Sequence, residues 1–125
     1  MNAVLDAGAL IAIDRRDRRV GAMLRLLQQR RVPVWTSAAV LAQVWRDGRR
    51  QARLAQLLAG VGVRALSATE ARRAGELQAA TGTNDVADAH LALLVSAGDV
   101  VLTGDADDIS RLLASRRVKA RLVAV

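Results

Sequence analysis

The stretch Val100-Val101-Leu102-Thr103-Gly104-Asp105 joins a short apolar run to a glycine and a carboxylate. Such a run, bounded by turn residues, predicts a buried strand that ends in an acidic turn. The chain begins in a similar way, because Val4-Leu5 leads directly into Asp6. Other short apolar segments bring the expected strands to about five, over residues 3–5, 32–35, 61–66, 100–103 and 120–125.

Amphipathic segments between the strands predict helices over residues 19–29, 37–45, 50–59, 67–80, 85–97 and 107–115. The helix over 67–80 opens on Ser67-Ala68-Thr69-Glu70, which has the form of a capping box. Strands that alternate with helices are typical of βαβ units, in which a parallel sheet is covered on both faces. We therefore expect one α/β domain over residues 1–125, with a central parallel sheet.

The composition is that of a globular protein, with 52% hydrophobic and 25% charged residues in a chain of 125. The absence of cysteine excludes disulfides, thiolate chemistry and cysteine-based zinc sites. No signal peptide is evident, and no apolar run reaches the roughly 18 residues that a membrane span needs. We expect a soluble, cytoplasmic protein.

The net charge is +7, and every basic residue except Lys119 is an arginine. A positive field attracts phosphate polyanions, and arginine binds phosphate through two parallel hydrogen bonds. The same composition can reflect a GC-rich genome, with the arginines on solvated helix faces. The charge alone therefore leaves a nucleic-acid partner open. The densest run of charge, residues 14–19, is typical of a solvated turn.

Asp88 lies where an aspartate is least expected, because residues 83–94 read as a helix buried on most sides. Burying an unpaired carboxylate costs several kcal/mol, so such a group is normally paired, protonated or bound to a metal. Asp85 lies three residues earlier and shares the same helix face near its N-terminal part. An arginine partner for Asp88 is the structural alternative.

Asp6 and Asp105 follow two of the predicted strands, and the carboxyl ends of parallel strands face one edge of the sheet, where sites form. Each of the four aspartates could alone be a helix cap or a turn residue. Together they would repel one another and raise one another's pKa unless a cation neutralised them. Oxygen ligands without histidine or cysteine favour Mg²⁺ or Mn²⁺, which support phosphodiester hydrolysis.

The remaining candidates indicate structure more than chemistry. His90 is a lone histidine that we expect to pack or to hydrogen-bond. Trp35 and Trp45 are the only aromatic residues, and we expect core or subunit packing rather than base stacking. A phospho-aspartate receiver would want a lysine after the last strand, whereas Lys119 precedes it. A haloacid-dehalogenase-like phosphatase would want an aspartate where Gly8 stands.

Three short motifs resemble those of PIN domains, and specifically of VapC-type toxins from bacterial toxin–antitoxin pairs. They are Val4-Leu5-Asp6-Ala7-Gly8-Ala9-Leu10-Ile11-Ala12, Asp88-Ala89-His90-Leu91-Ala92 and Val101-Leu102-Thr103-Gly104-Asp105. Their order and spacing extend the resemblance over nearly the whole chain. It implies a three-layer α/β/α fold and a magnesium-dependent endoribonuclease, usually dimeric. An antitoxin would inhibit it by covering or entering the acidic groove.

Carried over by position, the resemblance implies Asp6 and Asp88 as the principal metal ligands, with Asp105 completing the acidic cluster. Thr103 and Asp108 would support them. We expect Asp6, Asp85, Asp88 and Asp105 to be catalytic and Asp6, Asp88 and Asp105 to hold the metal.

Gln43 is a departure from the pattern, because the family places a glutamate on this helix. Glutamine is isosteric but neutral, so it can hold a water molecule but cannot neutralise a cation or act as a base. We expect Asp85, one turn before Asp88, to restore the missing charge. Two hypotheses therefore stand: a metal-dependent ribonuclease toxin that cleaves RNA with activated water, and a non-catalytic or weakly active module that binds RNA or an antitoxin.

Overall fold

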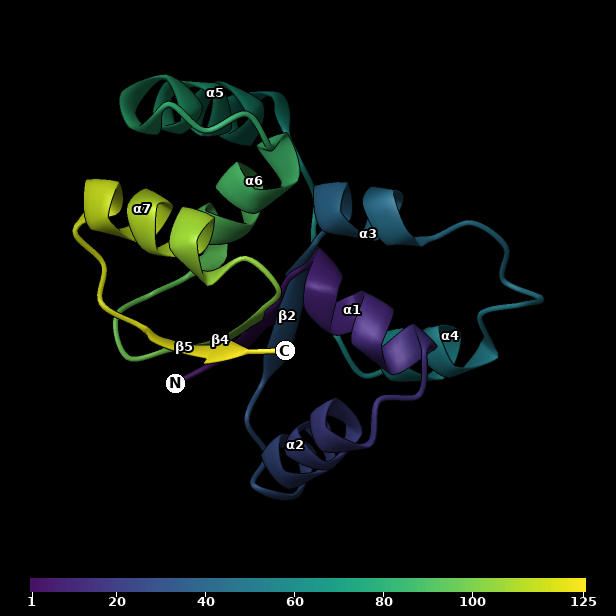
Figure 1. Ribbon diagram of the computed structural model, residues 1–125. Coiled ribbons are helices and arrows are strands. Elements are labelled where there is room, and N and C mark those ends of the chain that lie inside the picture. Colours follow the sequence, from purple (N-terminus) through teal and green to yellow (C-terminus); the bar gives the residue numbers. More distant parts are fainter.

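A computed structural model describes all residues from 1 to 125, with five strands and seven helices (Figure 1). In chain order the elements are β1 (Ala3–Leu5), α1 (Ala7–Asp14), α2 (Arg18–Gln29), β2 (Val34–Ser37), α3 (Ala38–Val44), α4 (Ala52–Leu58), β3 (Gly62–Arg64), α5 (Ala68–Thr81), α6 (Val86–Leu94), β4 (Val100–Thr103), α7 (Ala106–Arg116) and β5 (Arg121–Ala124). The predicted alternation of strands and helices is confirmed. None of the helices is long and apolar enough to cross a lipid bilayer.

The five strands form one sheet in the order β3-β2-β1-β4-β5, and every neighbouring pair is parallel. Parallel strands need crossover connections, and the helices supply them. Two groups of helices result: α1 contacts α2 and α4, whereas α5, α6 and α7 contact one another. With right-handed crossovers these groups cover opposite faces of the sheet, which gives the predicted three-layer α/β/α arrangement.

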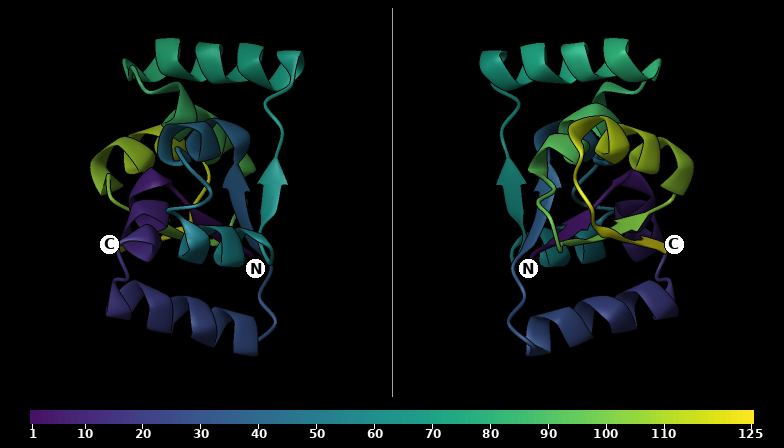
Figure 2. Two further views of the ribbon diagram at one scale, coloured as in Figure 1. Left: turned by 90° about the vertical axis from the view of Figure 1, so that its right-hand side faces the viewer. Right: turned by 90° about the vertical axis from the view of Figure 1, so that its left-hand side faces the viewer.

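Helix α3 joins the two groups, because it contacts both α1 and α6. Helices α5 and α2 lie at opposite ends of the molecule, with the sheet between them (Figure 2). The core is apolar and contains the central strands almost entirely, since Ala3, Val4, Leu5, Val101 and Leu102 are all at most 1% exposed.

The strand order reverses between β1 and β4, because the chain proceeds from β1 to β2 on one side while β4 lies on the other. In open α/β sheets this switch point is where ligands bind, outside the carboxyl ends of the strands. Leu5 is paired with Leu102, so Asp6, the first residue after β1, lies at the level of Thr103, the last residue of β4. The switch point therefore falls where the sequence places its carboxylates.

Some element boundaries differ from the predicted ones. The strand expected over 32–35 is Val34–Ser37, because the Val32 amide still bonds to the Leu27 carbonyl at the end of α2. The helix expected over 85–97 runs from Val86 to Leu94, with Asp85 as its N-cap. The strand expected over 61–66 is shortened to Gly62–Arg64 at the edge of the sheet.

Candidate metal centre at the carboxyl edge of the sheet

Asp6 is buried and fully engaged in hydrogen bonds. Its side chain caps α1 by accepting from the Ala9 amide at 3.0 Å. The Thr103 hydroxyl donates to Oδ2 at 2.5 Å, and the Gly104 amide donates to both carboxylate oxygens at 3.0 and 3.2 Å. These donors fix the carboxylate between β1 and β4.

A close approach of two glycines makes this arrangement possible. A Cβ atom on Gly8 would lie 2.8 Å from the Cα and N atoms of Gly104, which is closer than real Cβ contacts allow. The turn after β1 and the turn after β4 therefore meet backbone to backbone. This contact brings the Gly104 amide to the Asp6 carboxylate.

Asp88 differs from Asp6, because its carboxylate accepts no hydrogen bond from the protein although the residue is only 7% exposed. Burial raises its pKa, and the carboxylates of Asp85, Asp6, Asp105 and Asp108 raise it further, from 3.8 to about 7. The alternative of an arginine partner fails, since no ion pair involves Asp88. A cation bound at such a site would be stabilised, because it would offset the repulsion among these carboxylates.

Asp88, Asp105 and Asp108 form the tightest acidic group, with one carboxylate oxygen of each within 4.8 Å of the others. Asp105 caps α7 by accepting from the Asp108 amide at 3.2 Å, and its own amide bonds to the Thr103 hydroxyl at 2.9 Å. The group thus joins α6 to the start of α7. Asp108 belongs to this group, although the sequence indicates it only as a supporting residue. Asp6 lies beside the group, and its charge helps to raise the pKa of Asp88.

Asp85 is the N-cap of α6, and its Oδ1 accepts from the amides of Ala87 and Asp88 at 2.9 and 3.1 Å. The same oxygen accepts from Nε2 of Gln43 at 3.3 Å. Gln43 thus faces the acidic edge, as the sequence resemblance implies. Its amide serves as a donor to one carboxylate where a glutamate would add another.

An open cleft of about 590 Å³ flanks the acidic group and is lined by polar residues that include Gln43, Asp85, Asp108 and Arg111. Arg111 lies on α7, one turn after Asp108, with 4.0 Å between its Nη1 and Oδ1 of Asp108. Arg111 is a residue of this cleft that the sequence does not predict. The available signal was its i,i+3 spacing from Asp108.

His90 lies on α6 and is fully buried. It packs and hydrogen-bonds, as expected. The Ser37 hydroxyl already accepts from the amides of Ala39 and Val40, so it donates its own proton to Nδ1 of His90 at 2.6 Å. His90 therefore carries its proton on Nε2, which lies 3.5 Å from the Glu70 carboxylate.

Glu70 connects this buried histidine to the surface. Burial would raise the pKa of Glu70, but the hydrogen bond from Arg64, the nearby His90 ring and the Arg64 charge lower it overall. The Arg64 guanidinium donates to Glu70 at 3.0 Å. The resulting chain of contacts ties together the sheet, α5 and α6 behind the acidic edge.

The tryptophans do not pack in the core. Trp35 is 37% exposed and Trp45 is 38% exposed. Trp35 lies on β2 against Gly62, where the missing side chain leaves room for the indole ring. Trp45 lines an apolar groove between α3 and α4.

The parallel 3-2-1-4-5 sheet and the helix layers on both faces define a three-layer α/β/α domain with a PIN-like fold. Among solved structures the chain is similar to VapBC2 from Rickettsia felis, described in a crystal structure bound to a DNA fragment from their promoter. That match has a TM-score of 0.69 at 17% sequence identity and covers 100% of this chain and 99% of the other. No protein-family model matches the chain. No curated protein matches it either.

Proposed function

We propose that this protein is a metal-dependent endoribonuclease and the toxin of a toxin–antitoxin pair. The observation that carries the proposal is Asp88, a buried carboxylate without a protein donor among four other carboxylates. The whole-chain similarity in fold to VapBC2 supports the toxin assignment. The net charge of +7 supports a polyanionic substrate.

The donor set fits a hard divalent cation. Asp88, Asp105 and Asp108 offer carboxylate oxygens close together, and Mg²⁺, or Mn²⁺ in its place, prefers such ligands. In the proposal these residues hold the ion, with Asp6 as a further ligand at the same edge. When bound, a divalent cation supplies a Lewis acid that activates water and stabilises charge at the phosphodiester.

The surrounding residues then have separate tasks. Thr103 and Gly104 hold the Asp6 carboxylate in place through hydrogen bonds. Asp85 adds negative charge at the edge of the cleft, and Gln43 orients it through its amide. Arg111, with its side chain 57% exposed, is placed to bind a phosphate of RNA in the cleft.

The proposed partners are an RNA substrate, a cognate antitoxin and a second copy of the chain. An RNA substrate implies a cytoplasmic location. Exposed apolar side chains support a protein partner, since the groove that includes Leu41, Trp45 and Leu58 is entirely hydrophobic. Size-exclusion chromatography with light scattering tests the homodimer, which would be contradicted by a monomer at high protein concentration.

A second candidate function is a module that binds RNA or an antitoxin without efficient cleavage. The contact between Gln43 and Asp85 favours it, because a neutral donor occupies a position where a carboxylate would attract the ion. Restoring that carboxylate by Gln43→Glu should then raise metal affinity or activity. No change in either would count against this version.

The test is cleavage of RNA by the purified protein with Mg²⁺, with EDTA and with an Asp6→Asn variant. We expect cleavage that stops with EDTA and falls by at least about a hundredfold in the variant, since Asp6 supports the charge at the metal. Asp107→Asn, which neutralises an exposed carboxylate of α7, is the matched control. Cleavage that is unaffected by EDTA and by Asp6→Asn would overturn the proposal.

A further inference from the structure

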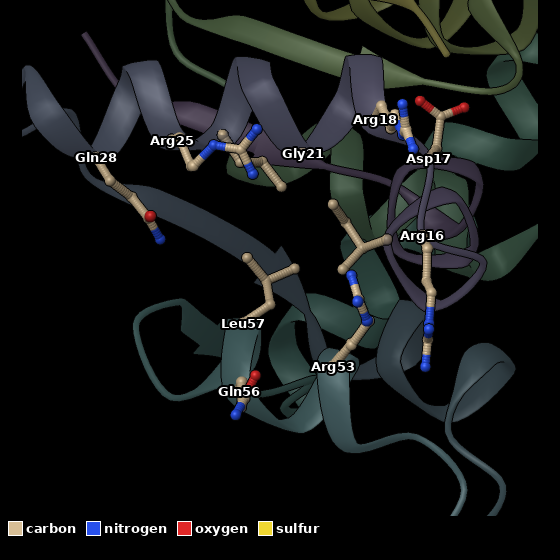
Figure 3. A pocket seen from close by; sticks show the side chains of 11 residues that line it. Arg16, Asp17, Arg18, Gly21, Arg25, Gln28, Arg53, Gln56 and Leu57 are labelled. Carbon is tan, nitrogen blue, oxygen red and sulfur yellow. The ribbon is translucent and has the colours of Figure 1, made fainter.

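A second cavity, of about 390 Å³, lies away from the acidic cleft, where the turn between α1 and α2 meets α2 and α4 (Figure 3). Ile13, Leu24 and Leu57 form its apolar lining. Its polar lining is dominated by arginines from three different segments of the chain: Arg16, Arg18, Arg25 and Arg53. The run of charge that the sequence indicates as a solvated turn therefore forms one wall of a cavity.

The positive charge at this cavity has no internal counterpart. None of its four arginines takes part in an ion pair, since the ion pairs of the protein involve Arg50, Arg64, Arg111 and His90. The only carboxylate in the lining is that of Asp17, which accepts from the Val20 amide at 3.0 Å to cap α2. Four guanidinium groups therefore surround one space with a single carboxylate among them. An anionic ligand would relieve their mutual repulsion.

The four arginines are exposed, and their side chains border the same cavity. Arg53 extends from α4 toward α2, and Arg25 folds back along α2 beside Gly21 (Figure 3). The Arg25 side chain lies against Gly21, because a Cβ atom there would be in ordinary van der Waals contact with Nη1 of Arg25, at 3.6 Å. The arginines of two helices thus face a common opening.

We propose that this cavity binds the phosphate backbone of RNA, apart from the site of cleavage. Guanidinium groups bind phosphate oxygens through paired hydrogen bonds, and Gln28 and Gln56 add neutral donors at the rim. No aromatic side chain lines the cavity, so it offers no surface for base stacking. Contacts of this kind position a nucleic acid without reading its sequence.

Helix α1 links this cavity to the acidic edge. The helix begins after its N-cap Asp6 and reaches the cavity at Ile13, and its 8 residues span about 12 Å. One RNA strand can therefore extend from the acidic cleft to the arginine cavity. This inference rests on the proposed function, and it assigns the cavity the task of fixing where the strand crosses the metal site.

The experiment compares the double variant Arg25→Gln/Arg53→Gln with the control Arg72→Gln/Arg73→Gln. The control removes the same charge from exposed positions of α5, at the opposite end of the molecule (Figure 2). Binding of fluorescein-labelled single-stranded RNA is measured by anisotropy in EDTA over a range of salt concentrations. We expect the cavity variant to bind about tenfold more weakly at 0.1 M salt and to lose about 1.4 from the slope of log affinity against log salt, because two phosphate contacts are lost.

The outcomes separate this inference from the proposed function. Equal affinities and slopes in the two variants would overturn the cavity assignment while leaving Mg²⁺-dependent cleavage in place. Weakened binding in the cavity variant of a protein that fails to cleave RNA would support the cavity and overturn the nuclease. Labelled poly-L-glutamate is the second probe. If the cavity substitutions weaken its binding and leave RNA binding unchanged, the cavity takes an acidic polypeptide and the RNA assignment is wrong.

Discussion

The buried aspartates of this chain differ in how their charge is satisfied. Asp6 accepts bonds from a hydroxyl and from backbone amides, and Asp99 accepts from the amides of Asn2 and Ser96 at 2.8 Å each. Asp88 receives no such donor and is surrounded by like charge. Burial alone therefore does not mark a functional carboxylate. The absence of donors is what distinguishes Asp88, the proposed metal ligand, from the other buried aspartates.

Replacing Asp88 by asparagine should stabilise the metal-free protein at high pH. With a pKa of about 7 in the folded state against 3.8, the folded protein binds more protons between these values. Its stability therefore falls as pH rises from about 4 to 7, and the cost is fully present above pH 7. We expect Asp88→Asn to raise the free energy of unfolding by about 1–3 kcal/mol at pH 8 in EDTA. The gain should shrink toward pH 5.

Urea denaturation at pH 5 and pH 8 measures this difference. Asp107→Asn serves as the control, because Asp107 is exposed in the first turn of α7 and its neutralisation should change stability by a few tenths of a kcal/mol at most. A loss of stability in Asp88→Asn at pH 8 would show that the carboxylate is satisfied in a way that this structure does not contain.

Substituting Gln43 by glutamate should have effects of opposite sign with and without metal. Without metal, the new carboxylate replaces a donor to Asp85 and repels it, so the melting temperature should fall. With Mn²⁺ present, added ligand charge should tighten binding about tenfold. Isothermal titration with Mn²⁺ and thermal melts in EDTA measure both effects. Gln43→Ala removes the donor without adding charge, and identical Mn²⁺ affinities in the two variants would exclude Gln43 from the ion's surroundings.

At the level of elements, the turns after β1 and β4 depend on the contact between Gly8 and Gly104. Gly8→Ala would force these turns apart, since its Cβ atom would meet Gly104 at 2.8 Å. We expect a loss of about 2–3 kcal/mol in the free energy of unfolding, from overpacking and a weakened bond between Asp6 and Gly104. Gly75→Ala is the matched control. It lies in α5 with open space around it, so it should stabilise the protein by up to about 1 kcal/mol.

Thermal and chemical denaturation of the two alanine variants measures the contrast. A Gly8→Ala protein as stable as the wild type would mean that the two turns tolerate separation. In that case the hydrogen bonds between the two turns would not be required for the structure of the acidic edge.

The buried contact between Ser37 and His90 joins the start of α3 to α6. Ser37→Ala removes both the cap of α3 and the donor to Nδ1 of His90, which would be left buried without a partner. We expect a loss of about 2–4 kcal/mol, against about 1 kcal/mol for Ser67→Ala, which removes only the exposed cap of α5. Equal losses in urea denaturation would show that the histidine contact adds nothing beyond the cap.

Several features of the fold follow from local pattern. Short apolar runs before Asp6 and Gly104 predict strands, and alternation with amphipathic segments predicts the parallel sheet, which is confirmed. The ends of β2 and α6 are not predictable in this way, because they depend on which backbone groups find tertiary partners. Thr36 and Ser37, for example, belong to β2 because they pair with β3. The Thr36 hydroxyl also donates to the Leu5 carbonyl at 2.7 Å.

The candidate site likewise contains residues that the sequence predicts and residues that it does not. Sequence position places Asp6 and Asp105 at one edge because both follow parallel strands. Asp108 and Arg111 reach the site because of the way α7 packs on the sheet. Residue spacing does not specify this packing. The arginine cavity depends on α2 meeting α4, so the sequence indicates only a charged turn there. The roles assigned to Asp6, Asp85, Asp88 and Asp105 stay predictions.

Over the whole molecule, charge of both signs is separated in space. The net charge is +7, yet the switch point of the sheet carries a concentration of carboxylates. Unpaired arginines surround the cavity at the far end of α1. A polyanion attracted by the positive field can approach the acidic edge only where its repulsion is neutralised. A divalent cation at that edge is therefore the central requirement of the proposed function.

Anomalous diffraction from crystals soaked in Mn²⁺ tests this requirement most directly. We expect a peak about 2.0–2.6 Å from carboxylate oxygens of Asp88, Asp105 and Asp108, with Asp6 beside it. Crystals of Asp88→Asn soaked in the same way should lose the peak. The absence of any manganese at the carboxyl edge of the wild-type sheet, at millimolar Mn²⁺ and pH 8, would contradict the account.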